Sequence, residues 1–111
     1  MSILKPHERI ILEILSKDIL SNITIESINT EGNILDYQTT GNGYFLDISH
    51  PKLPENRIVC GSPLLIGKSD NIDTGYIVFI ENQELTIECH GWGDKKIPND
   101  YRERNIEIEI A

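Results

Sequence analysis

Hydrophobic positions near the start of the chain recur at the spacing of an α-helix. Pro6 suits the first helical turn, because its missing N–H leaves no hydrogen bond unmade there. The apolar residues that follow fall on one side of a helix: Ile10, Ile11, Ile14, Leu15 and Ile19. Ser21-Asn22 ends the pattern, since Asn tolerates the left-handed conformation found just past many helices. The pattern predicts a helix over residues 6–20.

From residue 23 onward the pattern changes to alternation, which is typical of strands. Ile23-Thr24-Ile25 begins a first strand, and Ile28, which is out of phase with it, indicates a bulge or a bend. Further strands are expected over residues 34–40, 44–50, 57–66 (broken near Gly61-Ser62-Pro63), 75–81 and 84–90, and on Ile106, Ile108 and Ile110. Gly41-Asn42-Gly43 and Asn82-Gln83 predict turns, and residues 67–74 a polar loop.

The order of these elements predicts the fold class. Short connections favour an antiparallel sheet, because parallel pairs need long crossovers. We expect a single α+β domain over residues 1–111, with the N-terminal helix packed on a curved, mostly antiparallel sheet of six or seven strands. This arrangement resembles cystatin-like and NTF2-like half-barrels, and a β-sandwich with one helix is the alternative.

The charge balance narrows the classes of partner. The chain has 10 Lys and Arg against 18 Asp and Glu, a formal net charge of −8. Nucleic acids and anionic membranes are bound by clustered basic residues, so neither is expected as a partner. The acidity favours either solubility alone or attraction to a basic protein, and both stay open.

The chain's start and its cysteines suggest a compartment. Residues 1–5 lead straight into a charged segment and show no signal peptide, and the apolar run at residues 10–15 is too short to span a membrane. Cys60 and Cys89 lie in separate apolar runs, which is typical of buried free thiols. These features predict a cytoplasmic protein.

Motifs for catalysis, metals and cofactors do not emerge. Cys89 and His90 are neighbours on a strand and point to opposite faces, and the histidines are scattered. Residues 70–75 are similar to a calcium loop, but Ile72 stands where an oxygen ligand is needed. Residues 61–69 miss the phosphate-loop spacing by one residue. Asp47, on the same face as Ser49, leaves an isomerase-like pocket open as an alternative. We predict no catalytic residue, metal or cofactor, and no enzyme.

The lone tryptophan offers a possible binding surface. Trp92 stands between two glycines just after the 84–90 strand. It either folds back to cap the core or acts as an interface anchor, a role in which Trp is enriched. Acidic residues surround it, which suits a basic protein partner. The predicted partner-binding residues are Asp70, Asp73, Glu84, Glu88, His90, Trp92 and Asp94.

Residues 75–108 resemble a pattern in small bacterial immunity proteins. The segment GYIVFIENQELTIECHGWGDKKIP has a hairpin whose second strand reads hydrophobic-x-hydrophobic-Glu, followed by a glycine-containing loop and a proline. The resemblance is to immunity proteins of contact-dependent growth inhibition and polymorphic toxin systems. It implies a non-enzymatic cytoplasmic inhibitor that binds one basic toxin domain, often a nuclease. The alternatives are a small-ligand-binding half-barrel and a subunit that forms homo-oligomers through an exposed Ile-rich edge.

Overall fold

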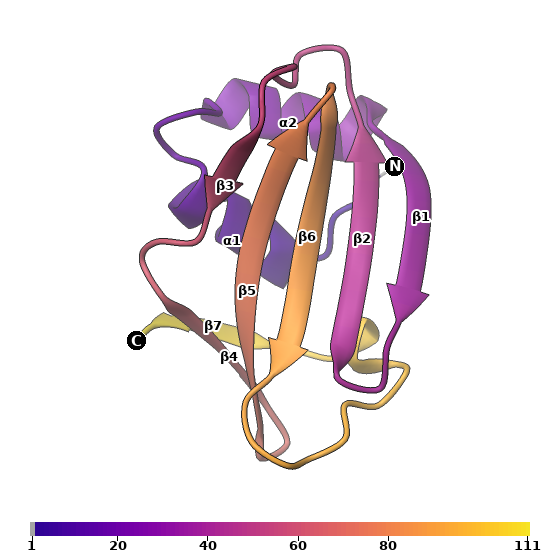
Figure 1. Cartoon of the computed structure of the whole chain (residues 1–111), viewed down its shortest axis with the longest axis vertical. Helices are drawn as coiled ribbons and strands as arrows, with labels where there is room; N and C mark the ends of the chain where they lie inside the picture. The colour runs from indigo at the N-terminus through magenta and orange to yellow at the C-terminus, as the bar shows by residue number, and fades with distance from the viewer. Residues whose placement is uncertain (1) are drawn as a thin grey trace.

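The computed structural model describes residues 2–111 and places two α-helices ahead of a seven-stranded sheet (Figure 1). The elements are α1 (Pro6–Leu15), α2 (Asn22–Glu31), β1 (Asn33–Thr39), β2 (Gly43–Ser49), β3 (Ile58–Cys60), β4 (Leu65–Ser69), β5 (Ile72–Glu81), β6 (Glu84–Gly91), the 3-10 helix η1 (Tyr101–Glu103) and β7 (Glu107–Ile110).

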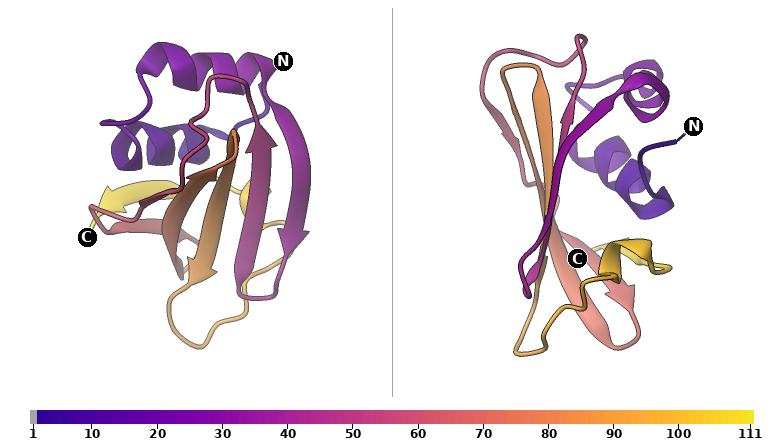
Figure 2. Two further views of the ribbon diagram at one scale, coloured as in Figure 1. Left: turned by 45° about the horizontal axis from the view of Figure 1, so that its top comes forward. Right: turned by 90° about the vertical axis from the view of Figure 1, so that its right-hand side faces the viewer.

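All strand pairs in the sheet are antiparallel. The order is β1-β2-β6-β5-β4-β7, and β3 pairs with the second half of β5. Both α-helices lie on the same side of the sheet, and β4 and β7 bend toward that side (Figure 2, right). The predicted α+β fold with a curved antiparallel sheet is confirmed. The β-sandwich alternative is wrong, because the strands form one sheet.

The core fills the space between the helices and the sheet. Alternate residues of β2, β5 and β6 point inward, as the sequence predicted, and are fully or almost fully buried: Tyr44, Leu46, Ile48, Tyr76, Val78, Ile80, Leu85, Ile87 and Cys89. The helices cover them with apolar residues of their own: Ile11, Leu12, Ile25 and Ile28. The other side of the sheet carries no helix (Figure 2).

A second helix replaces the strand predicted from Ile23. The Ser21 hydroxyl accepts a hydrogen bond from the Thr24 N–H at 3.1 Å, so Ser21 caps the start of α2 instead of ending α1. Ile25 and Ile28 are buried three positions apart, which is helical spacing, and Ile23 is exposed. Ile28, interpreted from the sequence as a bulge in a strand, is therefore a buried residue of helix α2.

Helix α1 is shorter than predicted. It ends at Leu15, five residues before the expected boundary, and Ser16, whose backbone leaves the helical conformation, is its buried C-cap. Leu20 is still buried, but it packs from the connection between the two helices. Apolar spacing alone did not mark this break, since the buried positions continue through it.

Residues 67–74 form a hairpin, not the predicted polar loop. Strand β4 continues to Ser69 and β5 starts at Ile72, with only Asp70 and Asn71 between them. Both turn residues have positive φ (49° and 64°), which Asp and Asn tolerate best among residues with a side chain. The turn at Asn82-Gln83 and the break between β3 and β4 near Pro63 are confirmed.

Candidate partner-binding face

The side of the sheet that faces away from the helices carries several acidic side chains that no ion pair within residues 2–111 compensates. We call it the outer face and define it by the outward side chains of four strands: Asp36 and Gln38 of β1, Phe45 and Asp47 of β2, Ile77, Phe79 and Glu81 of β5, and Glu84, Thr86, Glu88 and His90 of β6. These four strands contain no Lys or Arg. No Lys or Arg of these strands therefore neutralises the carboxylates, and His90 is the one basic side chain among the residues that define the face.

The strand register sets like charges opposite each other on this face. Asp36 of β1 pairs with Asp47 of β2, and Glu81 of β5 pairs with Glu84 of β6. None of the four forms an ion pair with any residue in the range 2–111. Directly opposed like charges destabilise a sheet. The free protein therefore holds electrostatic repulsion that bound positive charge would relieve.

Apolar side chains are interspersed with these carboxylates. Phe45 and Val59 are exposed by 37% and 53%, and Ile77 and Phe79 are half-buried. Val59 belongs to β3 and extends the face, because it pairs with Phe79. Apolar area ringed by charge is a common make-up of a protein-binding surface.

Trp92 lies over the end of this face and does not cap the core. A Cβ on Gly75 would lie too close to both the indole nitrogen of Trp92 and Nε2 of His90, so the two rings meet above this glycine. The backbone N–H of Trp92 donates to the backbone carbonyl of Asp73 at 2.9 Å, which fixes the start of the loop. Trp92 is 40% exposed. The indole of Trp92 is therefore exposed at the end of the outer face, where an interface anchor would have to lie.

The structure brings together most of the predicted partner-binding residues. Glu84, Glu88, His90 and Trp92 follow one another along the outer side of β6, and Asp73 lies beside Trp92. Asp94 is exposed in the loop that follows. Asp70 is different, since its carboxylate is 3.4 Å from Arg104 Nη1 and its charge is partly compensated.

Sequence reasoning left several members of the outer face out of the predicted set, among them four on which the argument depends: Asp36, Phe45, Asp47 and Glu81. The signal for three of them was the same alternation that identified the buried residues, because Phe45, Asp47 and Glu81 occupy the intervening positions. The position of Asp36 was harder to predict from the sequence, because the bulge between Ile34 and Asp36 shifts the register of β1.

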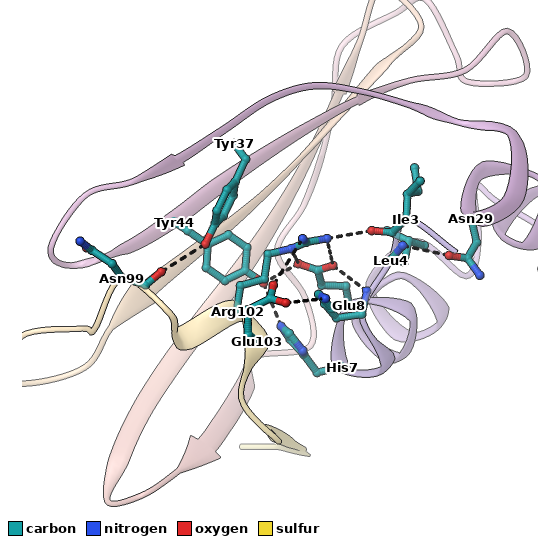
Figure 3. Close-up of polar contacts among 11 residues, drawn as sticks. Ile3, Leu4, His7, Glu8, Asn29, Tyr37, Tyr44, Asn99, Arg102 and Glu103 are labelled. Atoms are coloured by element: carbon teal, nitrogen blue, oxygen red, sulfur yellow. Dashed lines mark hydrogen bonds and ion pairs between the residues drawn. The ribbon is translucent and has the colours of Figure 1, made fainter. Parts of the chain in front are cut away.

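A buried ion pair on the opposite side of the sheet was not predicted (Figure 3). Glu8 of α1 is fully buried, and its carboxylate accepts hydrogen bonds from Nε and Nη2 of Arg102 at 2.7 and 2.8 Å. Tyr44 Oη donates to the same carboxylate at 2.7 Å, and the Lys5 N–H donates at 2.9 Å. Arg102 also donates to the Ile3 carbonyl. The network joins both ends of the chain to β2, and its saturated hydrogen bonding is that of a structural element.

His7 continues this network. Because Tyr44 Oη donates to Glu8, its oxygen accepts the hydrogen bond from His7 Nε2 at 2.9 Å. Burial lowers the pKa of His7 below 6.5, and burial together with Glu8 raises the pKa of Tyr44 well above 10. A neutral imidazole fits the donor role assigned to its Nε2.

Ser27 and His50 have the spacing of a nucleophile and a base, 3.0 Å between Oγ and Nε2. The protonation pattern opposes that role. Nδ1 of His50 accepts the Lys52 N–H at 3.1 Å, so in the neutral ring Nε2 carries the proton and donates to Ser27. Ser27 in turn donates to Glu31 at 3.1 Å. A ring that donates to the hydroxyl cannot take its proton, and the three groups form a structural chain beside a polar surface hollow.

The cysteines are buried free thiols, as predicted. Burial raises the pKa of Cys89 to about 12, so the thiol stays protonated at neutral pH. Residues 2–111 contain no group of three or more His, Cys, Asp or Glu placed to hold a metal ion. Neither α-helix in that range is long and apolar enough to cross a membrane.

Comparison with known proteins assigns no family. No protein-family model matches the chain, and comparisons with curated proteins and with solved structures find no match.

Proposed function

We propose that this chain is a non-enzymatic binding protein whose outer face docks a basic surface of a protein partner. The observation that carries the proposal is the uncompensated charge: Asp36 faces Asp47 and Glu81 faces Glu84, and their four strands contain no Lys or Arg. Repulsion of this kind lowers the stability of the free protein, and its relief on binding adds to affinity. Phe45, Phe79 and Trp92 supply the apolar contacts that slow dissociation.

We propose further that the partner is a toxin domain and that this chain is its cytoplasmic immunity protein. Two observations support the partner class: the resemblance of residues 75–108 to immunity proteins, and an acidic face that complements the basic, phosphate-binding surface of a nuclease. Covering that surface would block access of nucleic acid. The inhibitor then needs no reactive group of its own.

The small-ligand alternative requires a deep apolar pocket on the concave side of the sheet. That side is filled by the protein's own side chains, including Tyr44, Tyr76 and Ile11, each exposed by no more than 2%. The filled concave side and the open outer face therefore both favour protein binding over small-molecule binding.

The test uses the protein encoded immediately upstream as the probe. The two purified proteins are mixed at about 50 mM and about 300 mM NaCl, and their dissociation constant is measured by calorimetry. We expect a complex that weakens with salt, and loss of the probe's toxic activity when it is bound. Absence of binding at low salt between two folded proteins would contradict the proposal.

A matched pair of variants separates position from net charge. Asp36→Asn/Glu81→Gln/Glu84→Gln removes three charges from the outer face, and Glu13→Gln/Asp18→Asn/Glu107→Gln removes three exposed charges elsewhere. We expect the first variant to bind at least about tenfold more weakly than the second, the effect of roughly 1.4 kcal/mol. Equal affinities would assign the attraction to net charge alone and reject the outer face.

A further inference from the structure

Glu88 lies at the centre of an apolar and aromatic surround on the outer face. Across the strands it is paired with Phe45 on one side and Ile77 on the other. Along β6 it is followed by His90, and its side chain is only 25% exposed. A carboxylate shielded in this way interacts with a cation more strongly than a fully hydrated one does.

The Glu88 carboxylate has unused hydrogen-bonding capacity. The basic nitrogen that approaches it within residues 2–111 is Nδ1 of the His90 imidazole, 3.4 Å from Oε2. That nitrogen is itself buried and has no hydrogen-bond partner within that range, so the approach does not amount to a hydrogen bond. Two carboxylate oxygens are therefore available to donors that arrive from outside.

Trp92 lies at the end of this group of side chains, and Gly75 leaves room for its ring. The indole and the His90 imidazole meet above Gly75, where a side chain of any size would displace them. The indole therefore lies beside the ring that approaches Glu88, and it stays 40% exposed. A partly shielded carboxylate beside an exposed indole is suited to a group that is both cationic and flat.

We infer that Glu88 and Trp92 form a receptor for an arginine side chain of the partner. This inference rests on the proposed function and names the chemistry by which the outer face selects its partner. The guanidinium donates two parallel hydrogen bonds to the Glu88 carboxylate and stacks on the Trp92 indole. Lysine is disfavoured, because its ammonium is strongly hydrated and forms neither the paired hydrogen bonds nor the stack.

The test uses three short peptides that differ in one side-chain type: acetyl-Gly-Arg-Gly-Arg-Gly-amide, its lysine version and its citrulline version. Binding is followed by the amide shifts of Glu88, His90 and Trp92 in proton–nitrogen spectra, and by fluorescence of Trp92, the only tryptophan in the chain. We expect saturable shifts with arginine, about threefold weaker binding of lysine, and none of citrulline, which keeps the shape but lacks the charge.

Variants locate the receptor. Glu88→Gln is expected to weaken arginine-peptide binding about tenfold and Trp92→Leu about threefold. Gly75→Ala keeps every charge and is expected to weaken binding by displacing the two rings. Glu107→Gln on β7 is the control of equal charge change and should bind like the unaltered protein. Melting temperatures of all four variants show whether each is folded.

Two outcomes overturn the inference. One is equal binding of the arginine and lysine peptides, and the other is unchanged binding by Glu88→Gln. Both would leave the proposed function intact if the upstream protein still binds and the outer-face triple variant still weakens that complex. Conversely, arginine-selective binding at Glu88 combined with no binding of the upstream protein would reject the proposed toxin partner while keeping the receptor.

Discussion

The two sides of the sheet treat acidic side chains in opposite ways. On the covered side, Glu8 is fully buried, and Arg102, Tyr44 and the Lys5 N–H satisfy its carboxylate. On the outer face, Asp36 and Asp47 oppose each other and neither has an ion-pair partner in residues 2–111. A buried charge without a partner is too destabilising to persist, whereas exposed repulsion is tolerable. Compensation is thus required on the covered side, whereas the outer face is distinguished by carboxylates that oppose each other across the strands without compensation.

The largest effect is expected when the positive charge that compensates Glu8 on the covered side is removed. Arg102→Met keeps most of the side-chain volume but leaves the Glu8 carboxylate buried without its cation. We expect the free energy of unfolding, measured by urea denaturation, to fall by about 3–5 kcal/mol. Arg104→Met, which affects only exposed ion pairs, should cost less than about 1 kcal/mol.

A double-mutant cycle shows whether the loss belongs to the pair. Glu8→Gln removes the charge that Arg102 compensates, so the double variant Glu8→Gln/Arg102→Met should be destabilised by clearly less than the sum of the single changes. Additive losses would mean that Arg102 contributes through packing, for example against the Tyr37 ring 5.5 Å away, and not through Glu8.

The next effect in size concerns the tyrosine that links the ion pair to the sheet. Tyr44→Phe removes the hydroxyl that donates to Glu8 and accepts from His7, without changing the ring. We expect a loss of about 2 kcal/mol in denaturant unfolding, because the bond is to a charged group and the imidazole N–H is left unpaired. Tyr37→Phe is the control: its hydroxyl makes only a 3.5 Å contact at the surface, so its removal should have little effect.

The covered side should also be sensitive to acid through His7. Burial lowers the pKa of His7 in the folded protein, so below about pH 6.5 the unfolded chain binds a proton that the folded chain does not. The stability that His7 contributes is present above pH 6.5 and is lost as the pH falls toward the folded-state pKa, with a slope of at most about 1.4 kcal/mol per pH unit.

The measurement compares the protein with His7→Gln between pH 7 and pH 5. The other acid-sensitive groups titrate in both proteins, so the difference in slope isolates the imidazole. We expect the unaltered protein to lose stability more steeply. Parallel curves would show that the His7 ring takes up its proton equally well in the folded state.

The central strands were predictable from sequence because most of their buried residues follow a two-residue period. Leu85, Ile87 and Cys89 alternate with Glu84 and Glu88, and the structure places these two sets on opposite sides of β6 as expected. The turn at residues 82–83 was fixed by residue type in the same way. Local pattern sufficed for β2, β6 and the second half of β5, but it failed for the β4–β5 hairpin at residues 67–74, which it predicted as a polar loop.

The helical region and the ion pair were harder for physical reasons. Short apolar runs do not separate strand from helix, and the cap at Ser21 decided the matter for α2. Glu8 and Arg102 are 94 residues apart, and sequence alone contains no signal that joins them. The uncompensated pairs of the outer face depend on register as well, which emerges only when the strands are aligned.

The smallest expected effect is a gain in stability, unlike the losses expected on the covered side. Removing a charge from the outer face should stabilise the free protein. Asp36→Asn relieves the repulsion with Asp47 and leaves the bond from Thr86 to Asp47 in place. We expect a gain of about 0.2–1 kcal/mol in thermal or urea unfolding at low salt. Asp18→Asn, which changes an exposed acid in the connection between α1 and α2, is the matched control and should change little.

Salt separates repulsion from other causes of such a gain. At about 1 M NaCl charges are screened beyond roughly 3 Å, so the advantage of Asp36→Asn should nearly vanish if it is electrostatic. A gain that persists at high salt would instead indicate a conformational effect of Asn on β1, and a loss at low salt would show that Asp36 is stabilising. Either result would remove the contrast between the two sides of the sheet. A salt-sensitive gain in stability, together with weaker binding of the partner, would show that these strands give up stability for recognition.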